Sequence, residues 1–155
     1  MNELTYILTR WWDAALAIWP DKLSNAKMPT IEFNKRLTST AGRAWHDRNY
    51  IDISYKLYQE NVQAFEMDTI PHELAHIIAC KYFQSTGHDN AWRYVYQTLT
   101  GKTPSRCHSY SIARDTFKYK CKCKEWDLSK IRHNRSEQGR AYFCPHCKGI
   151  LVYNQ

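Results

Sequence analysis

A pair of histidines four residues apart, with a glutamate beside the first, constrains this chain more than any other feature of its sequence. The motif is His72-Glu-Leu-Ala-His76. Because residues i and i+4 lie on one face of an α-helix, both imidazoles can bind the same metal ion. Glu73 can then take a proton from a bound water, whose pKa zinc lowers to about 7. The motif predicts a catalytic zinc site on a helix, with Glu73 as the general base.

A catalytic zinc ion needs a third protein ligand as well as an open position for water or substrate. His88 is the nearest candidate, because it follows His76 by twelve residues and comes directly after a glycine at which the chain can turn back. Asp89 is the second candidate and His108 the third. We expect His72, His76 and His88 to bind the catalytic zinc, and the other two candidates remain open.

Four cysteines near the end of the chain form a second metal-binding pattern. Cys121 and Cys123 are followed, after twenty residues, by Cys144 and Cys147. Two such pairs separated by strand-like sequence are typical of a zinc ribbon, in which four thiolates hold one structural zinc. A disulfide framework is the weaker alternative, because nothing in the sequence indicates export. A segment of about 35 residues buries too little apolar surface to fold alone, so we expect zinc to be required for its folding.

The positive charge of the chain is concentrated in its last third. Residues 1–100 contain ten Lys and Arg against eleven Asp and Glu, whereas residues 101–155 contain twelve against four. Basic residues interleaved with aromatic ones are typical of a surface that binds single-stranded nucleic acid, although a solvated basic surface is the alternative. Trp126 fits such a surface or the core of the ribbon, whereas for Phe143 we favour the core. The predicted DNA contacts are Lys118, Lys120, Lys122, Lys124, Trp126, Arg132, Arg135 and Arg140.

The periodicity of apolar residues predicts an α+β fold in two domains, a zinc-binding domain over residues 1–114 and a small β zinc ribbon over residues 115–155. Short alternating runs predict a small antiparallel sheet from strands over residues 30–33, 40–45 and 50–54. Three- and four-residue spacings predict helices over residues 4–19, 56–65, 69–83 and 90–100. We expect Pro20 to end the first helix, Asp68 or Thr69 to cap the third, and Gly87 and Gly101 to close the last two. After Pro104 no helical periodicity is visible.

Composition excludes several classes of protein. Hydrophobic residues make up 43% and charged residues 24% of the chain, which is ordinary for a globular protein and unlike a disordered one. There is no run of about 18 apolar residues that could span a membrane, and the apolar N-terminal region lacks the features of a signal peptide. We therefore expect a cytoplasmic protein without a membrane partner.

The combination of these motifs resembles the SprT proteins of bacteria and the protease domain of eukaryotic Spartan. The resemblance rests on five segments: His72-Glu-Leu-Ala-His76, Gly87-His88-x-x-x-Trp92, Tyr119-Lys-Cys-Lys-Cys123, Arg132-His-Asn-Arg135 and Tyr142-Phe-Cys-Pro-His-Cys147. It implies a zinc metalloprotease fold that ends in a zinc ribbon. It also implies cleavage of proteins covalently trapped on DNA, with DNA binding as the activator.

Three functions follow from this sequence as hypotheses. The first is a DNA-binding zinc metalloprotease that acts on DNA-bound or DNA-crosslinked proteins, with one catalytic and one structural zinc. The second is a non-catalytic nucleic-acid-binding adaptor with two structural zincs, although such a site has no use for Glu73. The third is a general peptidase without DNA dependence, and the effect of DNA on cleavage separates it from the first.

Overall fold

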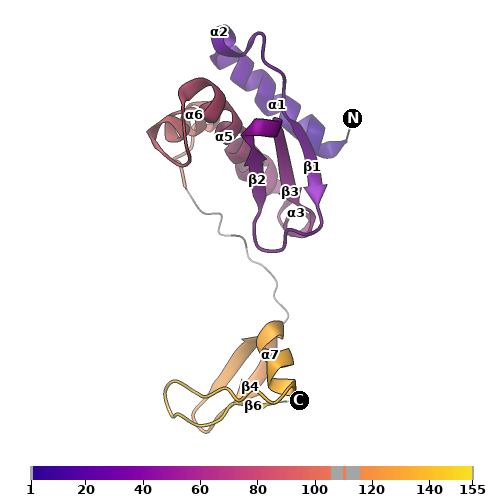
Figure 1. Ribbon diagram of the computed structural model, residues 1–155, viewed down its shortest axis with the longest axis vertical. Helices are drawn as coiled ribbons and strands as arrows, with labels where there is room; N and C mark the ends of the chain where they lie inside the picture. The colour runs from indigo at the N-terminus through magenta and orange to yellow at the C-terminus, as the bar shows by residue number, and fades with distance from the viewer. Residues whose placement is uncertain (1, 106–109, 111–115, 155) are drawn as a thin grey trace. The chain divides into compact units, whose positions relative to one another are not determined.

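The computed structural model describes residues 2–105, 110 and 116–154 and divides the chain into two compact units, Met1–Tyr110 and Ser111–Gln155 (Figure 1). The domain boundary expected between residues 114 and 115 falls outside the described residues. Among the helices that are described, none is both long and apolar enough to cross a bilayer. Helices combined with small sheets confirm the predicted α+β class.

The N-terminal unit consists of a three-stranded sheet and a set of helices. Its strands are β1 (Thr30–Asn34), β2 (Gly42–Trp45) and β3 (Tyr50–Ser54), with the 3₁₀ turn η1 (His46–Arg48) between the last two. Its helices are α1 (Glu3–Ile18), α2 (Pro20–Leu23), α3 (Tyr55–Glu60), α4 (Val62–Ala64), α5 (Ile70–Phe83) and α6 (Asn90–Thr100), and the π-helical turn η2 (Phe65–Thr69) leads directly into α5.

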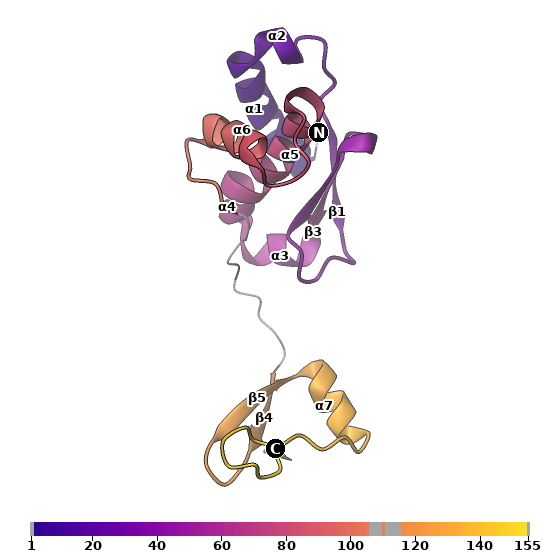
Figure 2. The same ribbon diagram turned by 60° about the vertical axis from the view of Figure 1, so that its left-hand side comes forward.

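The sheet is mixed, with strand order β1-β3-β2 (Figure 1), and Figure 2 shows β1 and β3 side by side. The pair β2–β3 is antiparallel, as expected, whereas β1 and β3 run parallel. The chain reverses between β1 and β2 and again at η1, so β3 returns to the direction of β1 and inserts beside it. Alternating apolar residues indicate strands but do not specify which strands become neighbours, so the expectation of a purely antiparallel sheet was wrong for this pair.

Helix α5 is the centre of the N-terminal unit. It contacts α1, α6, β2 and β3, and Ile70, Leu74 and Ile78 are fully buried. One face of the sheet supplies Ile51 and Ile53 to the same core. Burying an aliphatic side chain of this size stabilises the folded state by about 1.5–3 kcal/mol, so α5 is fixed in position on several sides.

The ends of the helices differ in part from the expected ones. α1 ends at Ile18, just before Pro20, and α6 ends at Thr100 with Gly101 as its C-cap at a φ of 70°, as predicted. α5 has no side-chain cap at its start, because η2 continues into it and leaves neither Asp68 nor Thr69 a capping role. Its C-cap is Gln84 in the left-handed conformation, with a φ of 59°, rather than Gly87. The helix expected over residues 56–65 is interrupted at Asn61, whose φ of −142° is not helical.

The described residues of the C-terminal unit, 116–154, form an antiparallel sheet of order β5-β4-β6 and one helix. The elements are β4 (Thr116–Lys120), β5 (Glu125–Ser129), α7 (Lys130–Glu137) and β6 (Val152–Tyr153). Its small core consists of Tyr119, Leu128, Cys144 and Leu151.

Helix α7 contradicts the prediction that no helix follows residue 104. Its sequence is polar, and its one large apolar side chain, Ile131, is 66% exposed, so apolar periodicity could not reveal it. His133 anchors the helix by stacking on Phe117: the ring centroids are 3.7 Å apart and the ring planes are 2° from parallel. A hydrogen bond of 3.1 Å joins the same imidazole to the hydroxyl of Tyr119.

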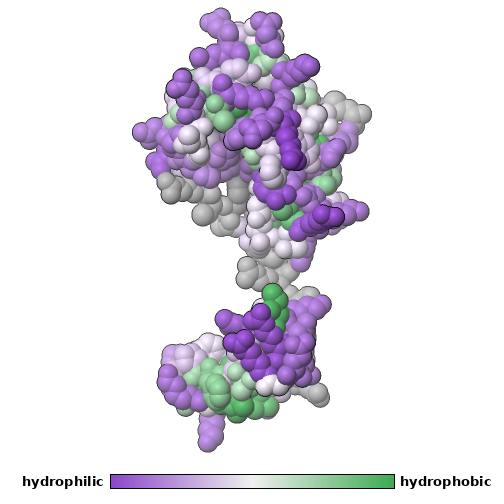
Figure 3. All heavy atoms as spheres, viewed as in Figure 1, coloured by the Kyte–Doolittle hydropathy of each residue, from purple (hydrophilic) through white to green (hydrophobic). Residues whose placement is uncertain are grey.

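Phe143 was expected in the core of this unit but is 62% exposed. Ile150 and Val152 are exposed as well. Figure 3 shows apolar side chains gathered on the surface of the C-terminal unit. A unit this small, organised around four cysteines, has room in its core for few large side chains. Trp126, by contrast, is half-buried and packs against the core.

Candidate active site and metal centres

The three histidines expected to bind the catalytic metal lie together in the N-terminal unit. His72 and His76 come from successive turns of α5, and His88 comes from the loop before α6. The Nε2 atom of His88 is 3.0 Å from that of His72 and 3.1 Å from that of His76. Tetrahedral zinc with Zn–N bonds of about 2.0–2.1 Å holds such nitrogens about 3.3–3.4 Å apart, so this geometry fits the ion closely.

Asp89, the second candidate for the third ligand, has a different role. Its carboxylate accepts hydrogen bonds from the backbone N–H groups of Thr86 at 2.9 Å and Trp92 at 3.0 Å, and from the hydroxyl of Ser85 at 2.8 Å. These hydrogen bonds, led by the one from Trp92, lower the pKa of Asp89 to about 2. Asp89 thus caps α6 and fixes the loop that carries His88. His108, the third candidate, lies outside the described residues.

Trp92 forms the wall of the histidine cluster and is 1% exposed. Its ring centroid lies 4.7 Å from that of His72, 5.2 Å from that of His76 and 4.5 Å from that of His88. Burial, followed by the proximity of His88, lowers the pKa of His76 to about 4. The imidazole is therefore neutral at pH 7 and offers a lone pair to a metal ion. Sequence reasoning assigned Trp92 no function, and its place four residues after His88 was the available signal.

Glu73 is 6% exposed and lies against strand β2. Burial, reinforced by the charge of Asp52, raises the pKa of Glu73 to about 8, although a hydrogen bond from the backbone of Ala44 opposes the rise. A cation held by the neighbouring histidines also lowers this pKa. The carboxylate fits because residue 42 is glycine: a Cβ atom there would lie 2.9 Å from Cγ and 3.2 Å from Oε1 of Glu73.

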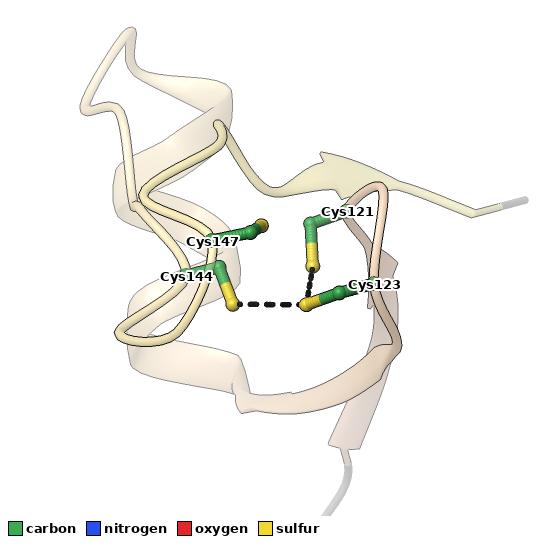
Figure 4. Close-up of side chains that lie close together, drawn as sticks. All are labelled: Cys121, Cys123, Cys144 and Cys147. Atoms are coloured by element: carbon green, nitrogen blue, oxygen red, sulfur yellow. Dashed lines mark hydrogen bonds between the residues drawn. The ribbon is translucent and has the colours of Figure 1, made fainter.

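The four cysteines converge in the C-terminal unit (Figure 4). Cys121 and Cys123 lie in the turn between β4 and β5, and the Sγ of Cys123 is 3.3 Å from that of Cys121 and 3.5 Å from that of Cys144. All four sulfurs lie within 4.8 Å of one another. A tetrahedral zinc ion with Zn–S bonds of about 2.3 Å holds its sulfurs about 3.8 Å apart, which lies within that limit. Hydrogen bonds that the Cys123 thiol donates to Cys121 and then to Cys144 raise the pKa of Cys123 to about 12, so a cation is needed to hold all four as thiolates.

The structure separates the predicted DNA contacts into two groups. Lys118 forms an ion pair of 2.9 Å with Asp127, and Lys120 lies opposite Glu125 in the β4–β5 ladder, so acidic residues offset both charges. Lys124 lies over the ring of Trp126, with Nζ 4.0 Å from the centroid. The remaining basic members of the predicted set are all exposed, and none occurs in a described ion pair: Lys122, Arg132, Arg135 and Arg140.

Comparison with known proteins gives one family. The model of the SprT-like family matches residues 16–113. Protein SprT of Escherichia coli O1:K1 / APEC is 38% identical over 133 residues, which cover 83% of this chain and 80% of that protein. Protein SprT of Klebsiella pneumoniae (strain 342) is 36% identical over 129 residues, which cover 80% and 77%. No solved structure gives a significant match.

These matches cover the histidine cluster, Glu73 and most of the rest of the chain. The resemblance to the SprT proteins, inferred from the five sequence segments, is thereby confirmed, and the chain belongs to the SprT-like family.

Proposed function

We propose that this protein is a zinc-dependent metallopeptidase that binds DNA and cleaves proteins bound or crosslinked to it. The observation that carries the proposal is a buried carboxylate, Glu73, beside three convergent imidazoles. A structural metal site needs ligands but no buried carboxylate next to them, and burying an ionisable group without a partner is costly. The arrangement therefore favours hydrolysis over a purely structural zinc.

The histidine cluster would hold the catalytic metal, since its three nitrogens leave a fourth position open. When zinc is bound there, it polarises the scissile carbonyl and lowers the pKa of a coordinated water. Glu73 accepts the proton of the attacking water at a carboxylate oxygen and passes it to the amine leaving group. Burial raises its pKa to about 8 and a cation on the histidines would lower it again, toward the neutral range that suits a group that both accepts and returns a proton.

The C-terminal unit would bind the second zinc and the DNA. Four thiolates close the coordination sphere, so this zinc would have a structural role. We assign the main DNA contacts to Lys122, Lys124, Arg132, Arg135 and Arg140, because their charges are exposed and lack a described acidic partner. Lys118 and Lys120 contribute less, because neighbouring carboxylates offset them. Trp126 supplies an aromatic ring beside Lys124.

One experiment separates this proposal from the two alternatives. The zinc-loaded protein is incubated with one substrate protein in three forms: free, mixed with DNA, and crosslinked to DNA. We expect faster cleavage of the crosslinked form than of the free form, with Glu73→Gln inactive on both. Equal rates on the free and crosslinked forms would favour a general peptidase, and no cleavage of any form would favour an adaptor.

A further inference from the structure

Strand β2 carries an exposed aromatic ring flanked by two arginines, on the face of the sheet that points away from α5. Trp45 is 38% exposed, and the Cζ atoms of Arg43 and Arg48 lie 5.1 Å and 5.4 Å from its ring centroid. Trp45 is the one ring with two cations among the cation–π contacts of the described residues. We call Arg43, Trp45 and Arg48 the Trp45 platform.

The register of the sheet places the platform opposite the zinc site. Arg43 pairs with Asp52 and Trp45 with Tyr50, whereas Gly42 and Ala44 pair with the buried Ile53 and Ile51. Successive residues of a strand point to opposite faces. Because Glu73 contacts the sheet at Gly42, the Trp45 platform lies on the other face.

A buried carboxylate holds the platform in place. Asp52 is 2% exposed and accepts hydrogen bonds from Nη2 of Arg43 at 2.6 Å, from Nε of the same side chain at 3.1 Å and from Nε1 of Trp45 at 3.2 Å. Asn34 donates a further bond of 2.6 Å to Asp52. The indole and one guanidinium are thus ordered before any partner binds, which lowers the entropic cost of binding.

Arg48 differs from Arg43, because no ion pair of its guanidinium is found among the described residues. Of the nearby acidic groups, Asp47 has its Oδ1 atom 2.8 Å from Nδ1 of His46. Glu32 accepts a hydrogen bond of 3.5 Å from the hydroxyl of Tyr50. Arg48 is exposed, so its side chain has room to turn away from the ring toward a neighbouring anion. The platform therefore offers a flat ring for stacking and an exposed cation beside it.

We propose that the Trp45 platform is a second contact for single-stranded nucleic acid, formed by the N-terminal unit independently of the ribbon. A base stacks on Trp45 while Arg48 meets an adjacent phosphate, the combination found in sequence-tolerant single-strand binding. The ribbon carries the same type of pair, with Lys124 over Trp126 and Arg140 over Tyr142. This inference rests on the proposed DNA-directed function. A peptide subsite is disfavoured, because the scissile bond must reach Glu73 on the other face of the sheet.

The test uses the full-length, zinc-loaded protein and a fluorescein-labelled oligothymidylate, with affinity measured by anisotropy at several salt concentrations. Trp45→Leu is expected to weaken binding about tenfold, the order of effect for losing one stacked base. Arg48→Gln, an exposed position, should lower the slope of log affinity against log salt by about 0.7, the value for one phosphate of a single strand. Tyr6→Leu is the matched control: its ring is 54% exposed on α1, and it should bind like wild type.

Photocrosslinking locates the contact directly. An oligonucleotide containing 5-iodouracil should attach to the tryptic peptide Ala44–Arg48, which contains Trp45. If wild type binds the oligonucleotide but Trp45→Leu and Arg48→Gln bind equally well and this peptide carries no adduct, the platform is refuted while the DNA-directed function stands. If wild type itself does not bind, the DNA-directed function fails and the platform with it. A higher KM for protein substrate in Trp45→Leu, with unchanged DNA affinity, would make the platform a peptide subsite and overturn the proposal.

Discussion

Replacing Gly42 by alanine tests how strand β2 positions Glu73. The new Cβ atom would lie 2.9 Å from Cγ of Glu73, 3.1 Å from Cδ1 of Ile53 and 3.2 Å from Oε1 of Glu73. Gly42 does not adopt a positive φ, so alanine can adopt its backbone conformation and the contact alone causes the effect. The first of these distances is shorter than packed carbon atoms tolerate, so the carboxylate must move.

The expected effect is larger on catalysis than on folding. Adding a methyl group to a packed core costs about 1–3 kcal/mol of the free energy of unfolding. If Glu73 is the general base, displacing its carboxylate by about 1 Å costs about 100-fold in rate. We expect kcat to fall by about that factor, whereas the zinc content stays at the wild-type value, because the atoms nearest to the new methyl group belong to Glu73 and Ile53 rather than to the three histidines.

The assay is the initial rate of cleavage of a DNA-crosslinked protein, with zinc measured on the same samples and thermal unfolding followed in parallel. Gly87→Ala is the matched control, because a Cβ atom there meets no heavy atom within 4 Å. A Gly42→Ala variant with wild-type kcat would refute the account of how Glu73 is held. An equal loss in Gly87→Ala would refute it too, since the contact with Glu73 would then not be the cause.

Three further predictions concern the metals, the loop and the ribbon. The protein should contain about two zinc equivalents by elemental analysis, and His88→Ala should lose one of them and Cys144→Ser the other, because the two clusters use different ligands. The stabilisation from Asp89 should be complete above its ordinary pKa of 3.8 and disappear as the pH falls to about 2. Thermal unfolding should therefore show a weaker acid destabilisation in Asp89→Asn than in wild type. This variant should also bind zinc less tightly, because the loop that carries His88 is no longer fixed. Charge reversal at Arg132, Arg135 and Arg140 should weaken DNA binding and flatten its salt dependence in titrations. Lys118→Gln removes a charge that is already paired with Asp127, so it should change the affinity and the salt dependence little. Equal effects would refute the division of the basic residues into free and offset charges.

Sequence reasoning was most successful where one element carries its own signal. The histidine motif, the strand Tyr50–Ser54 and the end of α6 at Gly101 depend on neighbouring residues, and the structure has all three as predicted. The place of β1 beside β3 could not be predicted, because strand order is decided by packing between distant segments. Helix α7 was missed because its contacts run through His133 rather than through apolar residues at helical spacing.

The candidate sites show the same division. The histidine and cysteine patterns predicted the residues that the structure brings together, although they left Asp89 and His108 open beside His88. The groups that tune these sites come from other elements: Gly42 makes room for Glu73, and Trp92 encloses the histidines. No pattern near residue 73 indicates a glycine thirty-one residues earlier as its neighbour.

The role of Glu73 as the general base is tested most directly by the rate at which zinc-loaded Glu73→Gln cleaves a DNA-crosslinked protein, compared with wild type at equal zinc content. The amide keeps the size of the side chain but cannot accept the proton of the attacking water at neutral pH. We expect an unchanged zinc content and a rate lower by several orders of magnitude. A Glu73→Gln variant that retains its zinc and cleaves at close to the wild-type rate would contradict this role.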